Sequence, residues 1–100
     1  MGLRKRRVGR MSIKWEIIYE KPARKYLATL EAKDQERIKS EVDKLSDGPF
    51  NRKDLDIKKL KGRDGWRLRI GKYRVIFMVY RFEVRINVLD VGSRGDVYKN

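Results

Sequence analysis

The spacing of apolar residues predicts a short strand followed by a helix near the start of the chain. Apolar and polar side chains alternate along residues 13–19, which is the period of a β-strand. Pro22 then suits the first turn of a helix. Ala23, Leu27 and Leu30 follow at i, i+4 and i+7, so they share one helical face. We therefore expect a strand that leads directly into a helix.

A second helix is predicted from a stripe of three apolar residues, Ile38, Val42 and Leu45, among mostly charged neighbours. The sequence DGP at residues 47–49 ends it, because glycine suits the left-handed position after a helix and proline cannot continue one. Few residues separate the two helices, so we expect them to form an antiparallel helical hairpin.

The second half of the chain is predicted to contain a loop and then three strands. The loop covers residues 50–65, and its apolar anchors are Phe50, Leu55, Ile57 and Leu60. Strands are expected at about 66–70, 73–80 and 84–91, with a two-residue turn between the first two that begins with glycine. The order β-α-α-β-β-β predicts an α+β fold, in which a small antiparallel sheet of about four strands packs against the N-terminal helical hairpin.

Three arginines lie close together in the predicted hairpin. A turn at 71–72 places Arg69 directly opposite Arg74, and because side chains alternate along a strand, Arg67 shares their face. The other face is apolar and carries Trp66, Leu68, Ile70, Tyr73, Val75 and Phe77. The hairpin is therefore expected to present a core face and a basic face.

Two interpretations of the basic face are open. One side of an antiparallel sheet usually meets water, so the arginines could form a plain solvated surface. Lysine and glutamate of mixed sign would serve that purpose without repulsion between like charges across the sheet. Since arginine binds phosphate through planar, bidentate hydrogen bonds, the pattern favours an anion-binding face.

The composition limits the chemistry that is available. The 100 residues suit one domain and include neither cysteine nor histidine. This excludes disulfides, thiolate metal sites and Ser-His or Cys-His nucleophile pairs. No apolar run approaches the roughly 18 residues that span a membrane, so no membrane partner is expected.

The charge balance indicates a polyanionic partner. Basic residues outnumber acidic ones by 27 to 14, which gives a net charge of +13. Five of the basic residues lie in the first ten positions, which hold no acid, and this leaves +8 on the rest of the chain. Nucleic acid is the commonest partner of such a protein. Residues 1–11 are predicted to be a flexible basic arm, and residues 12–100 a single domain.

Four segments of the sequence resemble the RelE/ParE superfamily of toxins from type II toxin–antitoxin pairs. They are KPARKYLATL at 21–30, IKKLKG at 57–62, WRLRIGKYRVIF at 66–77 and VLDVGSRGDVYK at 88–99. In this order and spacing they extend the resemblance over about residues 12–99, which leaves only the basic arm outside it.

The RelE-like branch of this superfamily comprises ribosome-dependent endonucleases that cut messenger RNA in the decoding site. By resemblance, Arg67 and Arg69 stand at two basic strand positions, Arg74 follows the hairpin turn, and Arg94 and Tyr98 match the terminal arginine and tyrosine. The resemblance implies that a ribose 2′-OH attacks the adjacent phosphate and leaves a cyclic phosphate and a 5′-OH. The arginines would stabilise the transition state, and Tyr98 would take the 2′-OH proton or align that hydroxyl.

The same resemblance implies a cytoplasmic toxin that acts on messenger RNA held by the ribosome, without a metal or other cofactor. Its protein partner would be an acidic antitoxin, through which it mainly oligomerises. Exposed basic residues are expected to dock on ribosomal RNA through phosphate contacts. They are Lys58, Lys59, Lys61, Arg63 and Lys72.

The sequence departs from the branch at three positions. Arginine replaces the usual lysine at 67 and 69, and a guanidinium stays protonated, so neither residue can act as a base. Ser93 stands where many members have histidine or lysine. The identity of the general acid is therefore left open.

Two other functions are compatible with the sequence. The ParE-like branch shares the fold but poisons DNA gyrase, and its members generally lack the arginine and tyrosine set found here. A non-catalytic module that binds RNA or the ribosome would share every basic feature, and only Tyr98 argues against it. The five matching positions favour the endonuclease.

Overall fold

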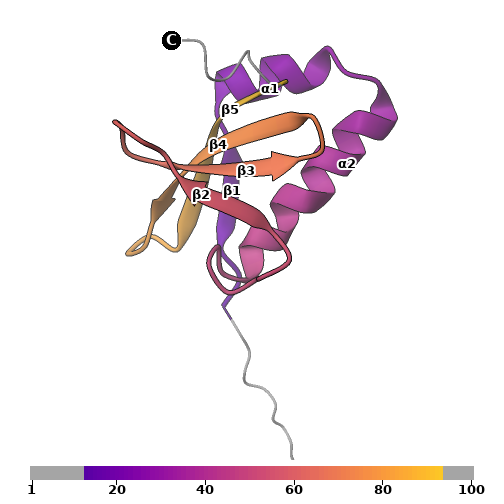
Figure 1. Cartoon of the computed structure of the whole chain (residues 1–100). Helices are drawn as coiled ribbons and strands as arrows, with labels where there is room; N and C mark the ends of the chain where they lie inside the picture. Colours follow the sequence, from indigo (N-terminus) through magenta and orange to yellow (C-terminus); the bar gives the residue numbers. More distant parts are fainter. Residues whose placement is uncertain (1–12, 94–100) are drawn as a thin grey trace, which may run out of the picture.

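The fold is built from two helices and five strands, as a computed structural model of residues 13–93 shows (Figure 1). The elements are, in chain order, β1 (Glu16–Tyr19), α1 (Lys21–Ala28), α2 (Ala32–Asp43), the 3-10 helix η2 (Lys44–Asp47), β2 (Asp56–Lys59), β3 (Trp66–Ile70), β4 (Tyr73–Tyr80) and β5 (Arg85–Ser93). None of the helices in this part of the chain has the length and apolar character needed to cross a membrane.

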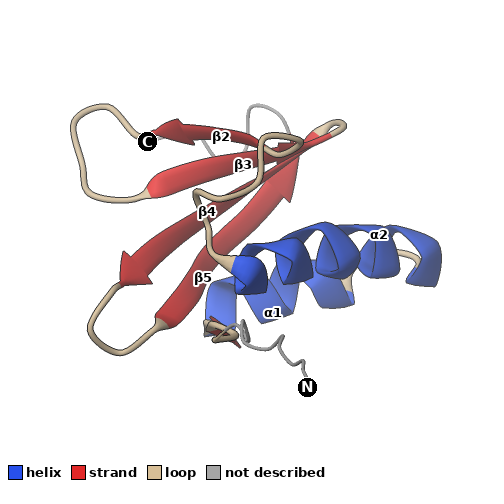
Figure 2. Cartoon of the chain, turned by 90° about the horizontal axis from the view of Figure 1, so that it is seen from below, coloured by secondary structure: helices blue, strands red, loops and turns tan. Residues whose placement is uncertain are grey.

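The five strands form one sheet in the order β1-β5-β4-β3-β2. Both helices lie against the same face of this sheet, so that within residues 13–93 the opposite face has no helical cover (Figure 2). The α+β class predicted from the sequence, with helices packed on one face of a sheet, is confirmed. This arrangement places the core on one side of the sheet and leaves the other side without helical cover among residues 13–93 (Figure 2).

The sequence-based prediction of the sheet is wrong in two respects. The observed sheet has five strands rather than about four. It is also mixed rather than antiparallel, because β1 pairs with β5 in parallel, with Ile17 opposite Ile86 and Tyr19 opposite Val88. Alternation of side chains predicts a strand but not its direction. A parallel pair needs a long connection, and here the chain passes through both helices and three strands before β5 returns to β1.

Strand β2 lies inside the segment that the sequence predicted to be a loop. It pairs with β3 in antiparallel register, with Asp56 opposite Arg69 and Lys58 opposite Arg67. Four residues, three of them charged, give too little alternation to predict a strand. The charges suit an edge strand, since they hinder pairing with other chains.

The core lies between the helices and the covered face of the sheet. From the helices come Ala23, Leu27, Ile38 and Val42, each at most 3% exposed. The sheet contributes the predicted apolar face of the hairpin, with Trp66 half-buried at its margin, together with its neighbours on β5. These residues are Leu68, Ile70, Tyr73, Val75, Phe77, Ile86, Val88 and Val91. Burial of a large apolar side chain contributes about 1.5–3 kcal/mol, so this layer accounts for much of the stability.

The β3–β4 hairpin has the predicted register, and this register orients the basic side chains. Its turn is 71–72, and Arg69 pairs directly with Arg74. Gly71 adopts a φ of +58°, which glycine tolerates without strain, and the Arg37 guanidinium from α2 packs against it. The two-residue turn therefore determines which residues of both strands share a face.

The last turn and strand are displaced from their predicted positions. The turn covers residues 81–84, so β5 begins at Arg85 rather than near residue 84, and it continues to Ser93 rather than ending near residue 91. Val84 has a φ of +51°, which is a strained conformation for a β-branched residue. Its N–H donates to the Arg81 carbonyl at 3.1 Å, and its carbonyl accepts from the Glu16 N–H at 2.9 Å. These two hydrogen bonds hold the strained residue in place.

Candidate functional site

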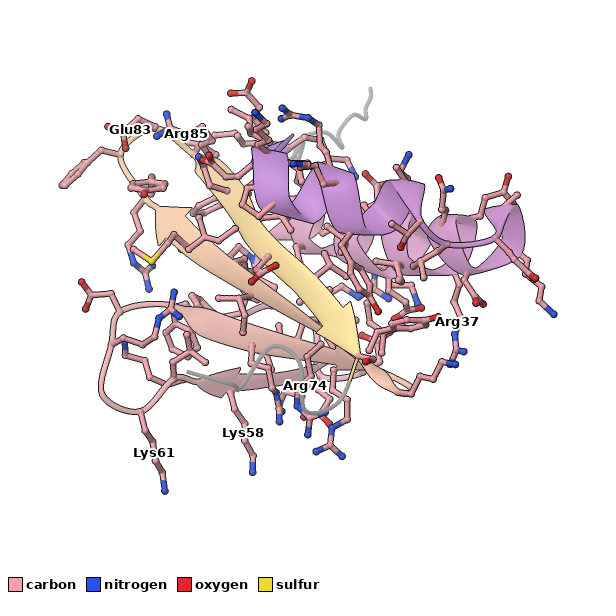
Figure 3. All side chains as sticks on the ribbon, turned by 90° about the horizontal axis from the view of Figure 1, so that it is seen from above. Arg37, Lys58, Lys61, Arg74, Glu83 and Arg85 are labelled. Atoms are coloured by element: carbon pink, nitrogen blue, oxygen red, sulfur yellow. The ribbon has the colours of Figure 1, made fainter. Side chains whose placement is uncertain are left out.

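The face of the sheet opposite the helices carries a basic cluster. The β3–β4 register places Arg69 beside Arg74, and the β2–β3 register adds Asp56 opposite Arg69 and Lys58 opposite Arg67. These five residues are called the arginine face below. Lys58 and Arg74 point away from the helices (Figure 3). The prediction that the three strand arginines share one face is therefore confirmed.

Two of the three arginines on this face are buried. Arg67 is 5% exposed and Arg74 is 7% exposed, whereas Arg69 is exposed. Removing a charged side chain from water is costly unless other groups compensate. The interpretation of this face as a plain solvated surface therefore does not hold for Arg67 and Arg74, because the sheet keeps both side chains largely out of water.

Asp56 belongs to the arginine face but was missed by the sequence analysis. Its Oδ1 accepts a hydrogen bond from Arg67 Nη2 at 2.7 Å, and its Oδ2 lies 3.8 Å from Arg69 Nε. One carboxylate thus offsets the charge of two guanidinium groups that would otherwise repel each other. The signal for this residue is its position opposite Arg69, which becomes visible only when β2 is recognised as a strand.

The end of β5 lies beside Arg74. Gly92 pairs with Arg74, and Ser93 pairs with Tyr73 at the hairpin turn. Because glycine has no side chain, β5 adds no side-chain bulk next to the Arg74 position. The two remaining residues of the predicted catalytic set, Arg94 and Tyr98, lie outside the described residues.

The five residues predicted to dock on ribosomal RNA are all exposed, but they do not form one patch. Lys58 lies on the arginine face. Lys59, one residue further along β2, faces the other side, and its Nζ lies 5.3 Å from the centre of the Trp66 ring. Lys61 and Arg63 lie in the loop between β2 and β3, and Lys61 points to the same side as Lys58 in Figure 3.

The fifth predicted docking residue is Lys72, at the tip of the hairpin turn. Its ammonium group lies 5.5 Å from the centre of the Tyr73 ring. The structure therefore brings Lys58 into the arginine face, whereas Lys59 and Lys72 lie over the rings of Trp66 and Tyr73, outside that face.

Two tyrosines in the described part of the chain have raised pKa values. Burial, with a smaller effect of the Asp43 charge, raises the pKa of Tyr19 to about 12. Burial also raises the pKa of Tyr73, and its hydroxyl donates a hydrogen bond to Asp34 Oδ2 at 3.0 Å, which favours the neutral form further. Both hydroxyls stay protonated near neutral pH, so neither Tyr19 nor Tyr73 can serve as a general base there.

The chemistry that this face supports is electrostatic. Guanidinium groups stay protonated and donate several hydrogen bonds in a fixed plane, which suits phosphate oxygens. Among residues 13–93, no three His, Cys, Asp or Glu side chains are grouped so that they could hold a metal ion. The face is therefore suited to binding an anion and to stabilising charge that develops on it.

A known family matches most of the chain. The family model described as the ParE toxin of the type II toxin–antitoxin system parDE matches residues 17–98. This range contains the whole sheet except Glu16, all three strand arginines, and the positions of Arg94 and Tyr98.

Named relatives resemble the chain over nearly their whole length. A protein of Methanocaldococcus jannaschii that bears the name toxin RelE1 is 32% identical over 89 residues, covering 88% of this chain and 99% of the relative. The RelE–RelB complex of Pyrococcus horikoshii contains a chain with 30% identity and a TM-score of 0.71, covering 84% of this chain and 99% of that one. The RelB–RelE antitoxin–toxin complex of Methanococcus jannaschii gives 27% identity and a TM-score of 0.65, covering 81% and 94%.

Proposed function

Since the chain belongs to the ParE toxin family of type II toxin–antitoxin systems, and to the RelE-like branch of the RelE/ParE superfamily, we propose that it is a ribosome-dependent endoribonuclease. It acts in the cytoplasm and cuts messenger RNA in the decoding site of the ribosome, which stops translation. The observation that carries this proposal is the arginine face, where Arg69 lies directly opposite Arg74 and beside the buried Arg67.

The proposed reaction is a transesterification within the messenger RNA. The 2′-oxygen of a ribose attacks the adjacent phosphorus, and the bond to the 5′-oxygen of the next nucleotide breaks. The products are a 2′,3′-cyclic phosphate and a 5′-OH, so one proton leaves the 2′-OH and one is delivered to the leaving oxygen. Extra negative charge develops on the phosphate oxygens in the transition state, and guanidinium groups aimed at them stabilise it.

The remaining roles are assigned to residues near the C-terminus. Arg94 adds a further cation to the site, and Tyr98 accepts or aligns the 2′-OH proton. The arginines cannot take this proton because they stay protonated. An acid–base group placed in this way usually contributes about 100- to 10,000-fold in rate.

The partner of the toxin is a cognate antitoxin, in line with the structural relatives that are named as complexes of RelE with RelB. We propose that this antitoxin is acidic and that higher assemblies form mainly through it. An acidic chain would complement both the arginine face and the excess of basic residues in the toxin.

Inhibition of DNA gyrase is the second candidate function, and the description of the matching family as the parDE toxin favours it. The same fold would then be used without the cleavage chemistry. A third candidate is a non-catalytic protein that binds RNA or the ribosome, which needs only the basic surface. These functions differ in what the purified protein does to messenger RNA and to gyrase.

The test compares two activities of one preparation. The purified toxin is added to ribosomes programmed with a messenger RNA, and cleavage is followed by mapping new 5′ ends. Supercoiling by gyrase is measured in parallel. Ribosome-dependent cleavage that Arg69→Gln slows and Lys33→Gln does not would support the endonuclease, since Lys33 lies on α2 away from the arginine face. Gyrase inhibition without cleavage, or ribosome binding with neither activity, would overturn it.

A further inference from the structure

The charge arrangement on the arginine face assigns a role to Asp56, on the premise that the proposed function holds. We propose that Asp56 is a positioning residue, whose carboxylate holds the Arg67 guanidinium in place and leaves Arg69 to meet the substrate phosphate. The pair Asp56–Arg67 then acts as a fixed support for the cation that binds RNA.

The contacts of Asp56 differ between the two arginines. Arg67 Nη2 donates to Asp56 Oδ1 at 2.7 Å, which is a charge-assisted hydrogen bond. Arg69 Nε lies 3.8 Å from Asp56 Oδ2, which is beyond hydrogen-bond distance but close enough for attraction between the charges. The carboxylate is therefore bonded to Arg67 and only adjacent to Arg69.

Arg67, which is bonded to Asp56, is also the more buried of the two arginines on β3. The Arg67 side chain is 7% exposed, and its Nε is buried without an acceptor among residues 13–93. The Arg69 side chain is 46% exposed. A phosphate arriving from solvent can reach the Arg69 guanidinium. The Arg67 guanidinium is buried and already donates a hydrogen bond to Asp56.

The sheet register explains why this support is needed. Arg69 faces Arg74 on β4, and like charges directly opposite each other destabilise a sheet. Asp56 faces Arg69 from the other side, on β2, and supplies the opposite charge. Without it, the three arginines would repel one another and move apart, and the donors would no longer be preorganised for a phosphate.

A different role for the same carboxylate makes the opposite prediction. If Asp56 occupied the place of the phosphate and competed with it, removing the charge would tighten RNA binding and speed cleavage. If Asp56 positions Arg67, removing the charge slows cleavage. The sign of the change in rate therefore distinguishes positioning from competition.

The test uses Asp56→Asn in the full-length toxin, with Asp54→Asn as the matched control. Asp54 lies two residues earlier, has a similar exposure of 51% and pairs with an arginine, Arg52, at 2.8 Å away from the arginine face. We expect single-turnover cleavage on saturating ribosomes to fall about 10- to 100-fold in Asp56→Asn. Ribosome affinity should stay within about twofold, and Asp54→Asn should cleave like the wild type. A folded Asp56→Asn protein that cleaves at the wild-type rate or faster would overturn the proposal.

A double-mutant cycle distinguishes a positioning role of Asp56 from a general loss of structure. Arg67→Lys keeps the positive charge but loses the planar fork that Asp56 holds. If the two residues act as a pair, the double variant with Asp56→Asn should cleave no more slowly than the slower single variant. Independent, multiplying losses in the double variant would contradict the pairing.

A measurement without RNA keeps this inference separable from the proposed function. In nitrogen NMR of the arginine side chains, the held Arg67 guanidinium should show slow rotation about its Nε–Cζ bond. Asp56→Asn should abolish this signal, and Asp54→Asn should leave it intact. If the wild type fails to cleave RNA but shows this pattern, the proposed function fails and the holding of Arg67 stands. An Arg67 signal unchanged in Asp56→Asn would overturn the positioning role.

Discussion

Arg67 and Arg69 are two residues apart on one strand, yet their surroundings give them different chemistry. Arg67 is 5% exposed and bonded to Asp56, so its guanidinium has little freedom. Arg69 is exposed and has no hydrogen bond to the same carboxylate. At the scale of single residues, β3 therefore supplies one cation that is held in place and one that is accessible, and the proposed cleavage would require a separate group to move the proton.

Tyr98 is the residue proposed to move or align that proton. Tyr98→Phe keeps the ring and any stacking on a base but deletes the hydroxyl. We expect single-turnover cleavage on saturated ribosomes to fall by about 10- to 1000-fold, while ribosome affinity stays near the wild-type value. Wild-type cleavage by Tyr98→Phe would show that the tyrosine is at most a stacking surface and that water or a ribosomal group takes the proton.

Tyr19 allows a test of burial at a single residue through its pKa, which burial raises to about 12. In unfolded protein a tyrosine ionises near 10, so the native state holds this proton more tightly. The stabilisation that this provides is complete below about pH 10 and is lost as the pH rises towards 12. We expect the free energy of unfolding to fall less steeply over this range in Tyr19→Phe than in the wild type.

The titration of Tyr19 can be measured directly by the ultraviolet absorbance of tyrosinate. The difference between wild-type protein and Tyr19→Phe should show one group that ionises near pH 12 when folded and near pH 10 in urea. A difference curve centred near 10 in the folded protein would contradict the burial of this hydroxyl.

At the scale of elements, the hairpin was predictable and the edge of the sheet was not. Glycine at the start of a two-residue turn, with alternation on both sides, determined the register that joins Arg69 to Arg74. Strand β2 is short and mostly charged, so its sequence carries no comparable pattern. Asp56 was missed for the same reason, because its role depends on pairing with β3 rather than on any local motif.

The turn between β4 and β5 stores backbone strain at Val84, which has a φ of +51°. A non-glycine residue in this conformation costs on the order of 1–2 kcal/mol. Glycine adopts it freely but loses about 0.5–1 kcal/mol through greater freedom of the unfolded chain. We therefore expect Val84→Gly to raise the free energy of unfolding by about 0.5–1 kcal/mol in urea titrations.

The neighbouring residue provides the control for this turn. Glu83 is exposed and does not have a positive φ, so Glu83→Gly gains no relief of strain. It should lower the free energy of unfolding by about 0.5–1 kcal/mol. Equal destabilisation by both glycine substitutions would show that the Val84 conformation carries no significant strain.

At the scale of the whole molecule, the core and the charge are separated onto two sides of one sheet. The helices cover the apolar side, and the arginine face occupies the other (Figure 3). The sequence predicted the apolar face and the basic face of the hairpin, because apolar and basic side chains alternate along its strands. It could not predict the parallel pairing of β1 with β5, or the burial of Arg67 and Arg74, because both depend on contacts between distant segments.

This separation makes the antitoxin interaction testable as an electrostatic one. We propose that the acidic antitoxin inhibits the toxin by covering the arginine face or by displacing the C-terminal segment. The dissociation constant should then rise as salt increases, because screening weakens the attraction between exposed charges. Arg69→Gln, which removes an exposed cation from the face, should reduce the salt dependence more than Lys33→Gln on α2. An affinity independent of salt would contradict this mechanism. It would indicate an apolar interface, and the antitoxin would then be expected to bind on the helical side of the molecule (Figure 2).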